Sequence, residues 1–589
     1  MKQLLFSVLL VGMTACSADA PQAPVTASVN TTDANAAATD TWDKGAMVAA
    51  ADPRAVEAGL AVLRNGGHAV DAAIAVHSVL GLVEPQSSGL GGGAFMLVYD
   101  RASGTTTVID GRETAPATVT PDLFMKDGEP MGFIESWQSG RSVGVPGQIA
   151  LYKSAHDAFG TAPWASLFES GIALADEGFV VSPRLANLLN GDRLRGAIKL
   201  DENPGSSDYF YPQGTPLQEG DVRDNPEYAA TLRKIAAEGP AGFYTGEIAE
   251  AMVNAVQAND GGLSLEDLAG YSVKTRAPLC GKFRAYRICS APPPSSGGVA
   301  QNMILGLYDR LLPSGPDVDI ESTDRLLAFV EAQRLAYADR DHYVADADKV
   351  QVPAEDLINP RYLDARALQG GPVDATPKPG DPGEVLGRAP MIDMWGRDTT
   401  EHAPGTTHIS IVDQNGNAVS MTATVEAAFG SSIWASGFVL NNELTDFARQ
   451  PEINGKPVAN APAAGKRPRS SMSPTLVFDA EDDLFMVTGS PGGNSIIAYV
   501  AKTLVGVLDQ GETAQDSTAL PNIVARGQNV SVEVDRANGQ GIADYLKSLG
   551  YSVRERRGEN SGLHVIVVRE DGLEGGADPR REGVALALD

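Results

Sequence analysis

Two glycine-rich segments are the parts of this chain whose residue types most directly suggest chemistry. They are Gly89–Gly93 and the run Gly489-Ser490-Pro491-Gly492-Gly493. Consecutive backbone N–H groups can bind a phosphate, or they can form an oxyanion hole for a tetrahedral intermediate. The third interpretation is close backbone packing at a turn. Neither segment has the Lys-Ser/Thr of a P-loop or the spacing of a dinucleotide fingerprint. An oxyanion hole needs a nucleophile nearby, which this spacing does not supply.

A nucleophile is equally hard to find from spacing alone. The sequence has no Gly-x-Ser-x-Gly elbow and no Cys–His candidate, and its acidic pairs are ordinary. The seven histidines are scattered, with no H-E-x-x-H and no C-x-x-C. We therefore expect no metal site. From the residues by themselves, the chain is predicted to be an exported α/β protein with two glycine loops.

The first glycine loop is predicted to lie between two helices and a strand. Residues 53–64 carry apolar side chains at helical spacing and stop at Asn65-Gly66-Gly67, which is a helix-ending signal. Residues 70–82 form a second apolar helix that leads into the loop. Residues 94–99 follow as a strand. From 147 to about 370 the pattern is mainly helical, apart from a hairpin near 272–290.

Strands are expected to dominate the last third of the chain. Residues 371–404 are rich in Pro, Gly and Asp and are predicted to form a long exposed loop. Residues 407–412 and 418–425 then form paired strands around a hairpin signal at 413–417. Further strands are predicted at 475–478 and 484–488, followed by a helix near 494–508. Helices first and strands later predict a layered α/β protein.

The N-terminus is typical of an export signal. Lys2 precedes a short apolar run and Thr14-Ala15-Cys16, and the run is too short for a stable membrane span. The ending resembles a bacterial lipobox, in which Cys16 is lipidated, although Met13 is not the usual leucine. Residues 1–16 are therefore predicted to be the signal and 17–45 a flexible tether. Plain cleavage with a soluble product is the alternative. We expect a periplasmic or lipid-anchored protein.

The net charge argues against one class of partner, and the cysteines leave two structural possibilities. The chain has 75 Asp+Glu against 46 Lys+Arg, a net charge of −29. Such a surface repels phosphate backbones, so we expect no nucleic-acid partner. Apart from Cys16, the cysteines are Cys280 and Cys289. They could pair across the predicted hairpin in an oxidising compartment, or they could be two free buried thiols.

A family resemblance takes the analysis further. The run from Thr406 to Asp413, continuing through Gly416 to Ser420, closely resembles the start of the small subunit of gamma-glutamyltransferases. The resemblance covers nearly all of the chain after the tether. Other matching segments, in order, are 89–96, 110–116, 292–298, Glu331-Ala332, 337–340, 440–447, 466–474 and 489–493.

The resemblance implies an N-terminal-nucleophile hydrolase with an αββα sandwich. In this family the precursor cleaves itself before a threonine, here between Gly405 and Thr406. Residues 46–405 would form a large subunit and 406–589 a small catalytic subunit, together a heterodimer. A threonine hydroxyl is a weak nucleophile. Cleavage gives Thr406 an α-amino group, whose pKa near 8 suits a general base. No histidine is then needed, so we expect a structural role for His408.

The remaining roles follow from the shape of a gamma-glutamyl group, which has a free α-carboxylate and a free α-ammonium. By resemblance, Arg112 would bind the carboxylate, helped by Ser470 and Ser471. Glu443 and Asp446 would hold the ammonium. Three further roles complete the implied set: Gly492 and Gly493 as oxyanion donors, and Thr424 as the hydrogen-bonding partner of the nucleophile. No metal or organic cofactor is implied.

Two departures from the family pattern concern the pocket. Glu426 stands where many members have an asparagine that contacts the substrate amine. The segment between Phe447 and Gly465 differs in length from the lid loops of relatives, so the balance of hydrolysis and transfer stays open. The expected donors are glutathione and other gamma-glutamyl compounds, and the acceptors are water, amino acids or dipeptides. A related glutaryl or cephalosporin acylase and an inactive surface lipoprotein are the alternatives.

Overall fold

The computed structural model describes residues 42–191, 198, 200–313, 322–398, 400, 405–558 and 561–588. The predicted signal, Cys16 and nearly all of the predicted tether lie outside the described residues. Within them, no helix has the length and apolarity needed to cross a bilayer. Residues from Trp42 onward form one compact unit.

The first of two large sheets has seven strands, and every neighbouring pair in it is antiparallel. Its strands, in spatial order, are β24 (Val584–Ala587), β1 (Met47–Ala50), β11 (Gly405–Val412), β12 (Ala418–Glu426), β2 (Gly93–Asp100), β3 (Thr105–Gly111) and β8 (Lys274–Arg276). Strands from the two predicted subunits therefore alternate within one sheet.

The second large sheet has six strands and is also antiparallel throughout. In order they are β23 (Gly572–Ala577), β22 (His564–Arg569), β18 (Leu484–Gly489), β17 (Thr475–Phe478), β10 (Tyr286–Ser290) and β9 (Leu279–Phe283). The first four come from the predicted small subunit and the last two from the predicted large subunit.

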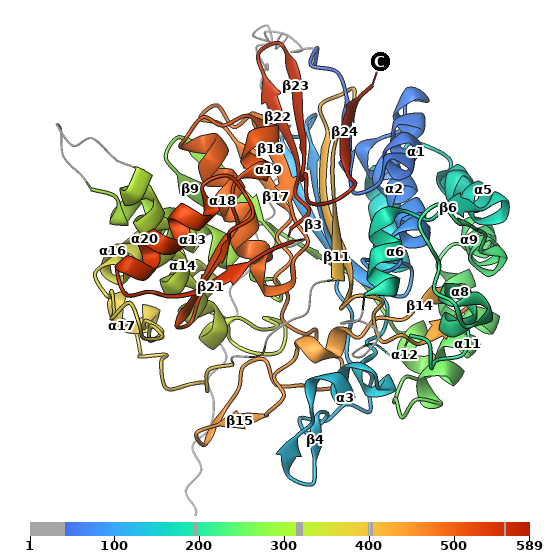
Figure 1. The fold of residues 1–589 in the computed structure, drawn as a ribbon, viewed down its shortest axis with the longest axis horizontal. Helices are drawn as coiled ribbons and strands as arrows, with labels where there is room; N and C mark the ends of the chain where they lie inside the picture. Colours follow the sequence, from blue (N-terminus) through green and yellow to red (C-terminus); the bar gives the residue numbers. More distant parts are fainter. Residues whose placement is uncertain are drawn as a thin grey trace, which may run out of the picture. The chain divides into compact units, whose positions relative to one another are not determined.

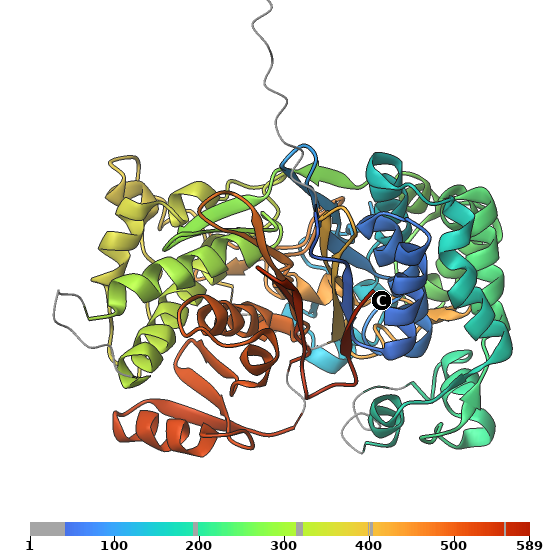
Figure 2. The ribbon, with the colours of Figure 1, turned by 90° about the horizontal axis from the view of Figure 1, so that it is seen from above.

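The two sheets are stacked face to face because their strands are apolar on both sides. Along β2, Ala94, Met96 and Val98 join one hydrophobic core, whereas Phe95, Leu97 and Tyr99 join the other, since successive side chains of a strand point to opposite faces. Figure 1 shows the strands between two groups of helices, and Figure 2 shows the same layers from above. The predicted αββα sandwich is confirmed.

Each helical layer packs on the outer face of one sheet. The helices that pack into the first core are α1 (Pro53–Arg64), α2 (Ala69–Val83), α3 (Phe133–Trp137), α4 (Gln148–Phe159), α5 (Glu169–Glu177), α6 (Pro183–Asn190), α8 (Ser206–Phe210), α9 (Pro226–Glu238), α10 (Ala241–Tyr244), α11 (Gly246–Gln257) and α12 (Leu265–Ala269). Those that pack into the second core are α13 (Gly297–Leu311), α14 (Ser322–Tyr343), α15 (Ala354–Leu357), α16 (Pro360–Ala367), α18 (Ile496–Leu508), α19 (Ala514–Ala519) and α20 (Gly539–Ser548).

Local sequence signals explain where the first elements begin and end. The carboxylate of Asp52 accepts a hydrogen bond from the Arg54 amide at 2.8 Å and so caps α1. The helix stops before Gly66, whose φ of 79° lies in the left-handed region that favours glycine. The predicted helices at 53–64 and 70–82 and the strand at 94–99 agree with α1, α2 and β2.

Most predictions for the later elements are also confirmed. The hairpin at 407–425 is formed by β11 and β12, the strands at 475–478 and 484–488 are β17 and β18, and the helix near 494–508 is α18. Residues 371–404 differ from the predicted exposed loop, since their described residues contain one short helix, α17 (Pro382–Val385), and buried side chains that include Asp381 and Asp398. Of the two possibilities for the cysteines, the structure has the disulfide between Cys280 and Cys289, which face each other across β9 and β10.

Candidate active site

The first residues of β11 lie in the middle of the seven-stranded sheet. Thr406 is 3% exposed and pairs with Thr424 on β12. Their Oγ1 atoms are 3.2 Å apart. Thr424 Oγ1 donates to the Gly405 carbonyl at 2.6 Å and accepts from the Glu426 amide at 2.8 Å. Because a hydroxyl has a single hydrogen, Thr406 must donate in the Thr406–Thr424 pair.

The first glycine loop supports this strand pair by close packing. A Cβ atom on Gly92 would lie 1.9 Å from the Thr424 carbonyl oxygen, so only glycine fits against β12 here. Gly91 forms an isolated bridge with Leu440. Of the three interpretations of Gly89–Gly93, the structure therefore supports backbone packing. This loop holds the strand that carries Thr424.

A small cavity opens at the start of β11. The residues that line it are Arg112, Thr406, Thr424, Glu426, Glu443, Asp446, Ser470, Ser471, Met472, Gly493 and Ile496. All the residues predicted to act on substrate are among them except Gly492. Gly492 precedes Gly493 at the start of a helical turn that continues into α18, and the φ angles of these two glycines are 140° and 56°. Both angles lie in the region that favours glycine.

Arg112 dominates the polar side of the cavity. Its guanidinium forms ion pairs with Glu443 and with Asp446, the second at 2.5 Å. It also donates to the carbonyls of Pro468 at 3.2 Å and Arg469 at 2.9 Å. Arg112 and Glu443 are each 1% exposed. The arginine and the two carboxylates expected to bind opposite ends of a glutamyl group are therefore paired with one another.

Because of this pairing, the cavity has only about 20 Å³ of free space, roughly the room that one water needs. A free carboxylate and ammonium entering the cavity would have to separate Arg112 from Glu443 and Asp446. The carboxylate would then replace Glu443 and Asp446 at Arg112, and the ammonium would replace Arg112 at those side chains. Glu443 and Asp446 thus contact Arg112 as a ligand carboxylate would, and Arg112 contacts them as a ligand ammonium would.

Burial shifts the pKa values of this cluster strongly. Burial raises the pKa of the Glu443 carboxyl well above its ordinary value and also raises that of Asp446, in spite of Arg112. Glu113, the next residue along the chain, is fully buried, and burial raises its pKa to about 7. Burial opposes the charge of Arg112, but Glu443 and Asp446 outweigh it and raise the pKa of Arg112. Several carboxyl groups thus compete for one guanidinium.

The segment with Ser470 and Ser471 is hydrogen-bonded to Arg340 of α14. Arg340 donates to Ser471 Oγ at 2.6 Å and to Ser296 Oγ at 2.9 Å. Ser296 Oγ in turn donates to the Ser470 carbonyl at 2.7 Å, and the Ser470 amide donates to the Pro294 carbonyl at 2.9 Å. These bonds fix the backbone and leave the two serines at the wall of the cavity.

Glu426 ends β12 with a backbone angle unusual for its residue type. Its φ is 77°, in the left-handed region that non-glycine residues rarely adopt. Such strain persists where the surroundings fix it, often at functional sites. The Asn442 side-chain amide donates to the Glu426 carboxylate. Many family members were expected to have an asparagine at the position of Glu426. Here an asparagine side chain, that of Asn442, lies beside Glu426 but comes from a neighbouring segment.

Comparison with known proteins identifies the family. A model of the family described as Gamma-glutamyltranspeptidase matches residues 55–588. The chain belongs to the gamma-glutamyltranspeptidase family. It is 35% identical over 547 residues to the glutathione hydrolase proenzyme of Escherichia coli strain K12, covering 91% of this chain and 90% of that one. It is 34% identical to the glutathione hydrolase proenzyme of Bacillus subtilis strain 168, covering 92% of each chain.

Two acylases are also similar to this gamma-glutamyltranspeptidase-family chain. The Acylase ACY 1 proenzyme of Pseudomonas sp. strain V22 is 31% identical and covers 92% of this chain and 93% of its own. The cephalosporin acylase from Bacillus halodurans superposes with a TM-score of 0.79 at 27% identity, covering 93% of this chain and 96% of that one. The Helicobacter pylori gamma-glutamyltranspeptidase gives 0.50 at 35% identity, with 54% and 90% coverage.

His408, close in sequence to Thr406, does not face the cavity of this family member. Its ring nitrogens contact Thr422 Oγ1 at 2.8 Å and Ser410 Oγ at 3.0 Å. Burial lowers the pKa of His408 well below its ordinary value, so the ring is neutral. This geometry supports the predicted structural role. In the part of the chain that the structure describes, no three His, Cys, Asp or Glu side chains are grouped to hold a metal ion.

The sequence analysis missed several residues around the cavity. Met472 and Ile496 supply its apolar wall, and Arg340, Asn442 and Glu113 support the polar groups. Met472, Arg340, Asn442 and Glu113 lie within the family-like segments, so their positions were visible although their roles were not. Ile496 had a weaker signal, as the first turn of the predicted helix near 494.

Proposed function

We propose that this protein is an autoprocessed gamma-glutamyltransferase that cleaves the gamma-glutamyl amide of glutathione and related compounds through a Thr406 ester. One observation carries the proposal. A single cavity brings together a buried threonine pair and an arginine–carboxylate cluster whose charges match the free α-amino acid end of a gamma-glutamyl group. Its similarity to glutathione hydrolase proenzymes over nine-tenths of the chain supports the same activity.

The first event is cleavage of the chain between Gly405 and Thr406. In the structure the Thr424 hydroxyl donates to the Gly405 carbonyl, which withdraws electron density from its carbon. The Thr406 hydroxyl belongs to the residue that directly follows this carbonyl, and its Oγ1 lies 3.2 Å from Thr424 Oγ1. Attack by Thr406 Oγ1 followed by hydrolysis uses one water and leaves a free carboxylate on Gly405 and a free amine on Thr406. The pieces are residues 46–405, if the chain begins at the predicted boundary, and 406–589.

The new amine then acts as the general base. Its ordinary pKa near 8 allows it to accept the proton of Thr406 Oγ1 at neutral pH. Thr406 Oγ1 attacks the gamma-amide carbon of the donor. The amide C–N bond breaks, the leaving amine takes the proton from the Thr406 α-amino group, and a gamma-glutamyl ester of Thr406 remains. Water, an amino acid or a dipeptide next takes the acyl group and releases the threonine. Gly492 and Gly493 are proposed to donate backbone N–H groups to the oxyanion in both steps.

Binding of the donor would use the groups that form ion pairs with each other in the structure. Arg112 would bind the α-carboxylate through two parallel hydrogen bonds, with Ser470 and Ser471 beside it. Glu443, Asp446 and Glu426 would face the α-ammonium. The carboxyl groups of Glu443 and Asp446 have raised pKa values, so an entering ammonium stabilises their ionised forms and releases protons. No residue of this mechanism requires a metal or an organic cofactor.

The Thr406→Ala variant tests the proposal directly. It should remain a single chain with no gamma-glutamyl hydrolysis, because it has lost both the cleaving hydroxyl and the nucleophile. The wild type should give a smaller piece of 184 residues on a denaturing gel, with Thr406 as its first residue on N-terminal sequencing. Thr407→Ala, one residue along the same strand, is the matched control and should be cut and active. A split, active Thr406→Ala protein would end the proposal.

A glutaryl or cephalosporin acylase is the second candidate, favoured by the similarity to acylase proenzymes. Glutaryl lacks the α-ammonium, so the burial of Glu443 and Asp446 in the cavity wall argues for the gamma-glutamyl group. Turnover of gamma-glutamyl and glutaryl anilides by the cut enzyme distinguishes the two. Faster turnover of the glutaryl compound would favour the acylase. A single full-length band from the mature wild type would instead favour an inactive surface protein.

Export and anchoring form a separate part of the proposal. The signal at 1–16 and the tether at 17–45 would place the enzyme in the periplasm, attached to a membrane through a lipid on Cys16. In a bacterial host, wild-type protein should partition into detergent and Cys16→Ser protein should stay in the aqueous phase. Equal partitioning of the two into water would favour plain signal cleavage.

A further inference from the structure

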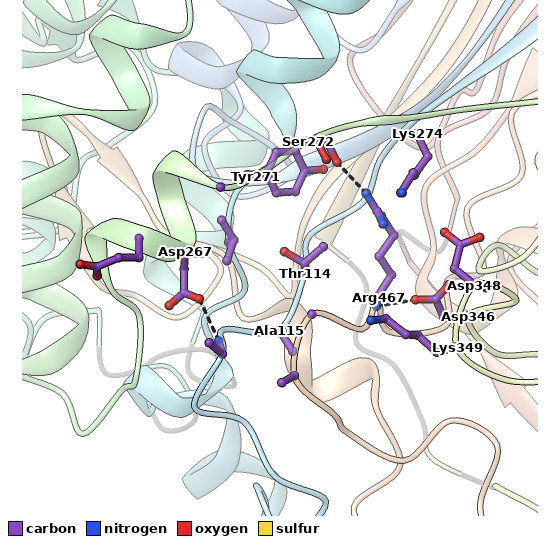
Figure 3. A pocket seen from close by; sticks show the side chains of 16 residues that line it. Thr114, Ala115, Asp267, Tyr271, Ser272, Lys274, Asp346, Asp348, Lys349 and Arg467 are labelled. Atoms are coloured by element: carbon purple, nitrogen blue, oxygen red, sulfur yellow. Dashed lines mark hydrogen bonds between the residues drawn. The ribbon is translucent and has the colours of Figure 1, made fainter.

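A second, larger cavity lies behind the segment that carries Arg112. It has about 630 Å³ of free space, within the usual range for small-molecule sites. Figure 3 shows its side chains, which come from residues 114–117, 145, 266–274, 346–349 and 464–467. The residues lining it are Thr114, Ala115, Ala117, Val145, Glu266, Asp267, Gly270, Tyr271, Ser272, Lys274, Asp346, Asp348, Lys349, Ala464, Gly465 and Arg467.

The basic side of this cavity has unused charge. Lys274 and Lys349 are exposed, and neither makes a side-chain hydrogen bond or an ion pair with another residue that the structure describes. Arg467 between them is 4% exposed and donates to the Ser272 carbonyl at 2.9 Å. Its Nε makes no hydrogen bond and lies 3.5 Å from Asp110 Oδ1. These three cations can bind a carboxylate.

The acidic residues on this side are already engaged. Asp346 accepts from the amides of Arg467 at 2.9 Å and Asp348 at 3.1 Å. Asp348 is paired with Arg276 at 2.8 Å. These contacts hold both carboxylates in place, but their charges still act on the cations, Asp346 on Arg467 and Asp348 on Lys274. A ligand carboxylate would therefore share the cations with them.

The opposite side of the cavity is acidic. Asp267 Oδ1 accepts from the Ala117 amide at 2.8 Å, and Oδ2 accepts from the amide and the hydroxyl of Ser264 at the start of α12, which leaves one lone pair, on Oδ1. Glu266 beside it makes no ion pair or side-chain hydrogen bond with another described residue. In Figure 3 Asp267 lies across the cavity from Arg467, Lys274 and Lys349. Asp267 thus faces a side of mixed charge, where Asp346 and Asp348 lie beside the three cations.

The same cavity touches the backbone of the donor site. The Tyr271 hydroxyl donates to the Arg112 carbonyl at 2.8 Å. The Ala115 amide donates to the Lys466 carbonyl at 2.9 Å, which ties the segment after Arg112 to the segment before Ser470. A ligand in this cavity would therefore contact both segments that position the donor, without entering the donor pocket.

We propose that this cavity is a second binding site, for a short peptide with free termini. Its carboxylate would lie at Lys274, Lys349 and Arg467 and its ammonium at Glu266 and Asp267. The free space suits two or three residues rather than a single small anion. The site is distinct from the donor pocket and does not depend on the activity proposed for Thr406.

The test is equilibrium binding of trialanine to the uncut Thr406→Ala chain, measured by calorimetry, so that no turnover occurs. One peptide should bind per chain. Reversing both exposed lysines (Lys274→Glu with Lys349→Glu) should weaken the affinity about tenfold. Lys282→Glu, an exposed lysine of β9 outside the cavity, is the matched control and should bind like the parent.

The two ends of the peptide can be assigned separately. Amidating its carboxylate should weaken binding and remove the effect of the lysine reversals. N-acetylating its amine should weaken binding and remove the effect of Glu266→Gln. Absence of saturable binding, or an affinity unchanged by the lysine reversals but lost in Arg112→Lys, would overturn the second site. The latter result would place the peptide in the donor pocket.

Discussion

Two buried arginines of this protein are surrounded by carboxylates, but the two clusters differ in how completely they are satisfied. At Arg580, all five N–H groups have acceptors. The acceptors are both oxygens of Glu533, one of Asp578, and the carbonyls of Thr518 and Leu520, at distances from 2.5 to 2.9 Å. At Arg112, the second oxygen of Glu443 and both oxygens of Glu113 are buried and accept no hydrogen bond from the guanidinium.

The pKa shifts follow the same difference. Burial alone would raise the pKa of Asp578, but Arg580, Lys502 and Ser561 outweigh it and hold that pKa below its ordinary value. Burial wins at Glu443 and Glu113, and their pKa values are raised. A saturated cluster is a structural element. Incompletely paired acceptors beside a cavity are what the ligand-binding role proposed for the Arg112 cluster would need.

The same substitution at the two arginines should give the sharpest contrast. Arg112→Lys keeps the positive charge but loses the planar pair of donors for an α-carboxylate. We expect kcat/KM for a gamma-glutamyl anilide to fall about 1,000-fold, equivalent to about 4 kcal/mol. Because the Arg112 cluster is incompletely satisfied, the free energy of unfolding should change much less. A variant with near-normal kcat/KM would contradict the comparison.

Arg580→Lys should show the reverse pattern. A lysine ammonium has three N–H donors at one point and cannot reach five acceptors, so buried groups would lose their partners. We expect the free energy of unfolding to drop by about 3 kcal/mol, measured by urea denaturation of the uncut Thr406→Ala chain. In the cut enzyme, kcat/KM per folded molecule should stay within about twofold. A large loss of kcat/KM at unchanged stability would show that this cluster is functional too.

The smallest effect concerns pH. The pKa of Glu113 in the folded chain, about 7, is above its ordinary value of 4.5, so the folded state binds this proton more tightly than the unfolded state does. The resulting stability is present below about pH 4.5 and is lost as the pH rises through 7. Glu113→Gln should therefore reduce the fall in unfolding free energy between pH 5 and pH 8 by about 2 kcal/mol.

Asp578→Asn is the matched control for this pH effect. The pKa of Asp578 is lowered, so its contribution to stability is lost only as the pH falls below its ordinary value of 3.8. The substitution should leave the slope between pH 5 and pH 8 unchanged. An identical slope in the parent and in Glu113→Gln would show that Glu113 does not hold a proton in the folded chain.

Much of the fold could be predicted from the sequence because its signals are local. The helix stop at Asn65-Gly66-Gly67 and the hairpin signal at 413–417 fixed the ends of elements, and apolar patterns fixed their types. The stacking of two sheets came from the family resemblance. The pairing of β1 with both β11 and β24 could not be predicted, because contacts between residues hundreds of positions apart leave no local pattern.

The candidate site was less accessible from residues alone. Thr406 is one threonine among many, and only the resemblance pointed to it. The resemblance also suggested that Arg112 and Glu443 bind a ligand, but not that they form an ion pair with each other. The role of Glu113 depends on burial, which its position in the sequence does not reveal. Whether Cys280 and Cys289 pair was open, and the register of β9 and β10 decides it.

The alternation of strands in the seven-stranded sheet has a consequence for the lifetime of the enzyme. Cleavage before Thr406 would leave β1 of one piece between β11 and β24 of the other, so neither piece could keep its part of the sheet alone. The uncut chain can search for this arrangement as a single molecule. Once cut, two separated pieces would have to find each other in solution. Maturation would thus turn a reversible folding equilibrium into a one-way step, after which the rate of unfolding sets how long the enzyme survives.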